Sequence, residues 1–173
     1  MWPLIKGMWN TRRGRKAAVA TIAPLVARSR HRLDGIPARA WLDPYMVGFM
    51  IMLITLSARR AINISDSQTL GAIQMEAWSD ITDQRMNLIG EETLHLSASE
   101  HKAFEQGCQN AVAFDLALYG TSVAGVADAA ATSRNDSTLE LHASDPRHPV
   151  HVSDDIMALW QHFFERHVVS VLR

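Results

Sequence analysis

Apolar residues recur at helical spacing along nearly the whole chain, and polar stretches separate the apolar segments. Sustained alternation of apolar and polar residues, which would indicate strands, does not occur. We therefore predict an all-α fold. It is a single helical bundle-like domain of about six helices over residues 15–173, preceded by a basic N-terminal arm at 1–14.

The most apolar segment of the chain runs from Tyr45 to Leu56. Asp43 and Pro44 form a helix start before it, because aspartate caps a first helical turn and proline fits the first helical position. The segment is shorter than the roughly 20 residues that a membrane-spanning helix needs. A helix that is apolar all round is typical of the centre of a bundle, so we expect a buried helix from Pro44 to near Ala61.

Capping residues and glycines set the bounds of the other predicted helices. The first helix is predicted at 15–32, where Pro24 could kink it, and the apolar helix described above is the second. The third runs from a capping box at 65–68 to a cap at Gly90, and the fourth from a capping box at 97–100 to Gly120. A short fifth helix is expected at 121–134 and a last helix after Ser153. The polar stretch 135–152 contains two prolines and is expected to be a long loop.

The composition is that of an ordinary globular protein. The chain has 173 residues, of which 47% are hydrophobic and 20% charged, and this excludes collagen, disordered and disulfide-scaffold classes. Its single cysteine, Cys108, cannot form an intramolecular disulfide and fits a reducing, cytoplasmic compartment. Cys108 lies on the apolar face of a predicted helix, so we expect a buried, inert thiol rather than a nucleophile.

The net charge of −1 hides an asymmetry between the two parts of the chain. Residues 1–60 carry a net charge of +9 and residues 61–173 a net charge of −10. Two explanations stay open: the basic end meets an anionic partner, or the two parts pair within the fold. The anionic partner would be a ribosome, a nucleic acid or a lipid surface, but no recognised nucleic-acid module accompanies the basic residues. We therefore expect no specific nucleic acid.

Sequence motifs for catalysis are missing. We find no nucleophile elbow, Walker loop or dinucleotide fingerprint, so neither an enzyme nor a cofactor is expected. Glu92 and His95 have the Glu-x-x-His spacing of di-iron bundles, which need two such motifs. A zinc site is the other metal hypothesis, and its ligands would come from Asp145 and from His142, His148 and His151. Both ligand sets are incomplete, so we expect no metal.

Several features stand in a familiar order. A basic, alanine-rich helix at 12–32 precedes the apolar helix, which ends in Arg59-Arg60. The run Asp80-Ile-Thr-Asp83-Gln-Arg85 leads to Gly90, and the pairs Phe114-Asp115 and Arg134-Asn135 precede the last apolar helix. In order and spacing, over about residues 12–170, the chain resembles the ubiquinol–cytochrome c chaperone family, the assembly factors of respiratory complex III.

The resemblance implies a non-enzymatic, all-helical assembly chaperone that helps newly made cytochrome b to mature. Its client would be hydrophobic, and it would act at the cytoplasmic face of a bacterial inner membrane, where it could also meet a ribosome or an anionic membrane surface. The alternatives are a metal-dependent enzyme that uses the histidine-rich loop, or a binding domain for an anionic partner. The candidate partner-binding residues are polar and charged: Arg12, Arg13, Arg15, Lys16, Asp80, Asp83 and Arg85.

A hydrophobic client also needs an apolar surface. Methionine adapts to varied partners, so the methionines of the second and third predicted helices are candidates for a client-binding groove. They are Met46, Met50, Met52, Met75 and Met86. Packing in the core is the alternative explanation for most of them.

Overall fold

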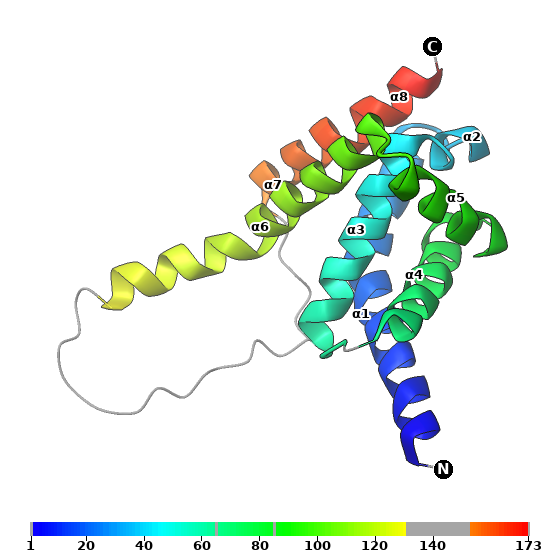
Figure 1. The fold of residues 1–173 in the computed structure, drawn as a ribbon. Coiled ribbons are helices and arrows are strands. Elements are labelled where there is room, and N and C mark those ends of the chain that lie inside the picture. Colours follow the sequence, from blue (N-terminus) through cyan, green and yellow to red (C-terminus); the bar gives the residue numbers. More distant parts are fainter. Residues whose placement is uncertain (1, 65, 85, 131–152, 173) are drawn as a thin grey trace.

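The computed structural model describes residues 2–64, 66–84, 86–130 and 153–172, with side chains at 9–64, 66–84, 89–120 and 153–172. Over these residues the chain is helical and contains no strand, which confirms the predicted all-α class (Figure 1). The helices are α1 (Trp2–Arg32), α2 (Ala38–Trp41), α3 (Pro44–Ala61), α4 (Ser67–Thr82), α5 (Met86–Ala98), α6 (Lys102–Ala130), α7 (Asp154–Trp160) and α8 (Arg166–Leu172), and a π-helical turn at Gln161–Glu165 joins the last two.

The central helix is α3, with the bounds that the sequence predicts. Its N-cap is Asp43, whose side chain accepts a hydrogen bond from the Tyr45 backbone N–H. It contacts α1, α4 and α6, and Figure 1 shows it between α4 and α6 with α1 behind. Because these neighbours cover it from different sides, nearly all of its residues as far as Ala58 are buried.

The first helix starts earlier than predicted. It begins at Trp2 rather than Arg15, so the segment expected to be a basic arm is the first part of α1. The helix also continues across Pro24. This proline is exposed, and a proline in a helix removes the hydrogen bond to the carbonyl four residues earlier, here that of the exposed Ala20. Water can therefore solvate that carbonyl.

The predicted third helix is two helices. The first of them, α4, is capped by Asp66 rather than by Ser65, which lies outside the described residues, and it ends at Asp83 in the left-handed conformation (φ 61°). Gly90, predicted to be a C-terminal cap, lies inside α5. The cap was wrong because the chain turns earlier, at Asp83, and a glycine can also lie inside a helix; a Cβ at Gly90 would make only an ordinary contact with Met75 Sδ at 3.6 Å.

The second predicted capping box was also wrong. Residues 97–100 end α5 instead of opening a helix, and Glu100 adopts a left-handed conformation (φ 50°) before α6 begins at Lys102. The next helix does not stop at Gly120 but continues to Ala130. The remainder of the predicted fifth helix, and the loop expected at 135–152, lie outside the described residues.

Aromatic rings fill the core between α2, α3, α4, α6 and the C-terminal helices. Trp160 stacks on Phe164 with ring centroids 4.4 Å apart, and Phe49 packs against both rings and against Phe114. The largest of the fully buried side chains are Trp41, Trp78, Trp160, Phe49, Phe114 and Phe164. Burial of this many large rings supplies the main favourable term for folding.

The methionine groove is not present in the form predicted. Met46 and Met50 are fully buried, and Met52 and Met75 are half-buried against the core. The side chain of Met86 lies outside the described residues. Packing therefore explains the four described methionines, because the thioether fills irregular space between the larger rings. None of the helices in the described part of the chain is long and apolar enough to cross a bilayer.

The backbones of α3 and α6 approach each other closely at two glycines. A Cβ atom at Gly48 would overlap the carbonyl oxygen of Phe104, and one at Gly107 would overlap the carbonyl oxygen of Tyr45. Such contacts are open only to glycine, since backbone atoms cannot rotate away as a flexible side chain can. The two glycines therefore set the distance between the two helices.

We predict that Gly48→Ala and Gly107→Ala each destabilise the fold, by about 1–3 kcal/mol or more, because the added methyl group forces α3 and α6 apart. Denaturant unfolding followed by circular dichroism measures the change. Gly71→Ala is the matched control: no atom lies within 4 Å of its Cβ position. As alanine is the better helix former, this variant should be about 0.5–1 kcal/mol more stable. Equal stabilities for Gly48→Ala and Gly71→Ala would contradict the close approach.

Candidate functional site

Part of the predicted partner surface is an exposed basic face on α1. Arg12, Arg13 and Lys16 are exposed, and none of them forms a hydrogen bond or ion pair with a described residue. Trp9, with 72% of its surface exposed, lies on the same face, since residues 9, 12, 13 and 16 are three or four positions apart. The four side chains line a groove of about 240 Å³. We call these four residues the basic face.

Arg15 lies elsewhere, at the contact between α1 and α4. Its Nε and Nη2 donate to the two carboxylate oxygens of Asp80 at 2.5 and 3.0 Å, and its Nη1 donates to Glu76 Oε2 at 3.2 Å. The hydrogen bond with Asp80 is the main cause that raises the pKa of Arg15 above its ordinary value. Two of the predicted partner-binding residues thus bind each other and hold two helices together.

Asp83 contributes to the same contact between α1 and α4. Arg30 donates from Nη1 to Asp83 Oδ2 at 2.7 Å and from Nη2 to the carbonyl oxygen of Ile81 at 3.1 Å. Arg85 lies outside the described residues. The predicted site therefore divides into two parts: ion pairs that join basic α1 to acidic α4, and the basic face, which is left free of such pairs.

The metal hypothesis rests on residues that the structure describes only in part. Glu92 and His95 lie on α5, and no group of three or more histidine, cysteine, aspartate or glutamate side chains gathers anywhere in the described ranges to hold a metal. His142, His148 and His151, together with Asp145, lie outside the described residues. The Glu92–His95 pair thus has no further ligand among its described neighbours.

An ion pair with a buried carboxylate and a half-exposed guanidinium joins α3 to α6. Arg60 donates from Nη2 and Nε to the two carboxylate oxygens of Asp115, at 2.5 and 3.2 Å, and its guanidinium lies 4.1 Å from the ring centroid of Tyr119. Asp115 is only 4% exposed, whereas the Arg60 side chain is 44% exposed. The hydrogen bond with Asp115 raises the pKa of Arg60. Both residues belong to the pairs on which the family resemblance rests, but the sequence does not indicate that they meet.

A second polar cluster, which the sequence does not predict, lies under the C-terminal helices. Trp160 Nε1 donates to Ser29 Oγ, and Ser29 Oγ donates to Glu165 Oε1, each at 2.8 Å. Arg32 Nη2 lies 2.7 Å from Glu165 Oε2, although not at the angle of a hydrogen bond. Glu165 is buried at the end of the π-helical turn and borders a groove of about 600 Å³.

A third cluster joins the start of α3 to α6 and α8. Tyr45 donates its hydroxyl proton to the carbonyl oxygen of Phe163 at 3.0 Å and accepts a hydrogen bond from Asn110 at 2.9 Å. Burial raises the pKa of Tyr45, and the Asn110 hydrogen bond opposes this shift. His167 stacks on Tyr45 and lies 2.7 Å from Asp43 Oδ1, so it is a satisfied, half-buried histidine rather than a free ligand.

No family model, no curated protein and no solved structure matches the chain. The resemblance to the ubiquinol–cytochrome c chaperone family therefore stays a prediction from the sequence. The structure shows that its motif residues take part in contacts between helices: Asp80 with Arg15, Asp83 with Arg30, and Asp115 with Arg60.

The Arg60–Asp115 pair gives an asymmetric prediction. Arg60→Ala leaves a buried carboxylate without a partner and should destabilise the fold by about 3–5 kcal/mol. Asp115→Ala leaves an arginine that can turn to solvent and should destabilise it by about 1.5–3 kcal/mol. Denaturant unfolding measures both values, and Arg59→Ala at the exposed neighbouring position should change stability by less than about 0.5 kcal/mol. A larger loss for Asp115→Ala than for Arg60→Ala would contradict this burial.

Cys108 should react slowly with thiol reagents at neutral pH. Burial is the main cause that raises its pKa, the charge of Glu105 adds to the shift, and the thiol lies 3.5 Å from the carbonyl oxygen of Gly48. Because the thiolate is the nucleophile, labelling by a maleimide should be slower than for an ordinary cysteine and should increase only at alkaline pH. The chain unfolded in urea is the control and should label rapidly. Equal rates for the folded and unfolded chains at neutral pH would refute the shift.

Proposed function

We propose that the chain is a non-enzymatic assembly chaperone of the kind that its sequence resembles. It holds a hydrophobic client, such as newly made cytochrome b, at the cytoplasmic face of a bacterial inner membrane before complex III is assembled. The observation that carries the proposal is an exposed apolar surface on α6. The charged side chains that pair with one another between helices also support it, because these contacts hold the helices in a fixed arrangement.

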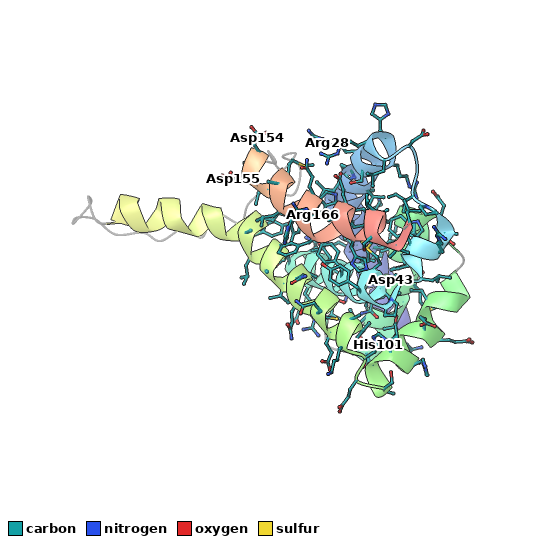
Figure 2. All side chains as sticks on the ribbon, turned by 90° about the horizontal axis from the view of Figure 1, so that it is seen from above. Arg28, Asp43, His101, Asp154, Asp155 and Arg166 are labelled. Carbon is teal, nitrogen blue, oxygen red and sulfur yellow. The ribbon has the colours of Figure 1, made fainter. Side chains whose placement is uncertain are left out.

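The client surface in this proposal is centred on two apolar residues of α6. Val112 and Leu116 are 38% and 62% exposed and lie one helical turn apart, with the exposed Ala113 between them. The helix continues to Ala130, and Figures 1 and 2 show this end extending past the rest of the fold. Exposed apolar side chains on α6 fit a hydrophobic partner, since their burial against that partner removes apolar surface from water.

The paired clusters support a scaffold rather than a catalytic centre. Asp115 is neutralised by Arg60, Asp80 by Arg15, and the buried Glu165 accepts a hydrogen bond from Ser29. Activated nucleophiles and general bases instead keep a reactive atom free to face a substrate. These three acids serve contacts between helices, which is what an assembly factor needs in order to present a firm surface.

Deletion and complementation in the source organism test the proposal. Deletion of the gene should lower the amount of assembled complex III, measured from the haem spectra of membranes. The wild-type gene should restore it, whereas Leu116→Asp should not, because a charge at this position opposes burial of the surface against the client. Leu172→Asp is the control, since Leu172 is also exposed (42%) but lies on α8. Cytochrome b should co-purify with the wild-type chain and not with Leu116→Asp.

Three outcomes would overturn the proposal. The first is normal complex III in the deletion strain, and the second is full complementation by Leu116→Asp. The third is zinc or iron bound stoichiometrically to the purified protein and lost when His142, His148 and His151 are replaced, because a metal-dependent enzyme would then be the better explanation.

A further inference from the structure

The basic face of α1 combines an exposed aromatic ring with exposed positive charge. Trp9 is the exposed large hydrophobic residue at its N-terminal end, and Arg12, Arg13 and Lys16 follow it on the next two turns without an ion pair to a described residue. The acidic Asp80 lines an adjoining groove with Arg12 and Lys16, but its carboxylate is held by Arg15. The three cations are therefore available to an external anion.

The position of this face in the molecule leaves it accessible. Figure 1 shows the N-terminal turns of α1 extending past the ends of α3 and α4. The sequence of these turns, from Trp2 to Trp9, is rich in bulky apolar residues (Trp-Pro-Leu-Ile-Lys-Gly-Met-Trp). A helix with aromatic and aliphatic residues beside lysine and arginine is typical of segments that lie in the interface of a membrane.

We propose that the basic face docks α1 on an anionic lipid surface, with Trp9 at the level of the headgroups and Arg12, Arg13 and Lys16 on their phosphates. Tryptophan prefers this level because its ring is apolar while its N–H can still find a polar partner. The cations gain attraction from the negative surface potential of the leaflet. The inference rests on the proposed function, because it identifies the membrane surface to which the proposed chaperone binds. Its test does not require the client protein.

The apolar residues favour lipid over nucleic acid as the occupant. A nucleic acid would use the cations for its phosphates and one aromatic ring for stacking. It would gain nothing from the leucine, isoleucine and methionine that precede Trp9 in the sequence. A bilayer interface accepts both kinds of residue at once, because headgroups and acyl chains meet there.

Vesicle binding by the full-length chain tests the inference. The protein should bind vesicles of phosphatidylcholine and phosphatidylglycerol in equal parts and not vesicles of phosphatidylcholine alone. High salt should weaken the binding, because it screens exposed charges. Trp41, Trp78 and Trp160 are already buried, so a blue shift of the fluorescence on binding must come from Trp2 or Trp9. Trp9→Phe, which keeps an aromatic ring but emits little, should lose most of that shift.

Substitutions separate the basic face from total charge. Arg12→Gln, Arg13→Gln and Lys16→Gln should each weaken vesicle binding by about fivefold. Arg28→Gln is the matched control, because Arg28, labelled in Figure 2, is exposed on the same helix but far along it from Trp9, and it should bind as the wild type does. All four positions are exposed, so thermal unfolding should be unchanged.

Several results would overturn the inference. One is absence of binding to the phosphatidylglycerol vesicles, and another is an equal loss of binding for Arg28→Gln and Arg12→Gln. A third is that co-sedimentation with ribosomes requires Arg12, Arg13 and Lys16 whereas vesicle binding does not. This result would assign the basic face to ribosomal RNA. If vesicle binding holds but deletion of the gene leaves complex III normal, the chaperone proposal fails and the lipid surface stands.

Discussion

The backbones of α3 and α6 can touch only because Gly48 and Gly107 carry no side chains. This close approach brings Phe49 of one helix against Phe114 of the other, and it places Arg60 within reach of Asp115. The rings of the C-terminal helices then pack on the same pair of phenylalanines. A wider separation would open space between rings that are now in contact, and the buried carboxylate would lose its partner.

The sequence predicts helices best where local signals and burial agree. For α3, the N-cap Asp43, the following proline and the apolar run all indicate the same element, and its bounds were right. The end of α4 and the turn after α5 were missed for the opposite reason: Asp83 and Glu100 adopt left-handed conformations that usually belong to glycine. Gly90 then gave a false signal, because here the glycine lies inside a helix rather than at its end.

The contacts of the candidate site could not be predicted from the sequence, because they join residues that are far apart along the chain. Arg15 and Asp80 were both named, but nothing in the sequence pairs side chains on two helices. Glu165 was missed because the sequence predicts only a regular helix after Ser153 and does not indicate a π-helical turn within it. The buried residues Trp160, Phe164 and Val168 are four positions apart, a spacing wider than the 3.6 residues of an α-helical turn. The π-helical turn at Gln161–Glu165 absorbs the difference.

The distance in sequence between α3 and its main partner has a consequence for synthesis. The chain emerges from a ribosome N-terminus first. The apolar α3, which ends at Ala61, is therefore synthesised before α6, which begins at Lys102. At synthesis rates of about 5–20 residues per second, α3 lacks its glycine-lined partner for about 2–8 seconds. During that interval α1, the short α2 and the emerging α4 and α5 are the helices that can cover it. Early docking of α1 and α4 through Arg15 and Asp80 would shorten the exposure of this most apolar segment of the nascent chain, and exposed apolar surface favours aggregation.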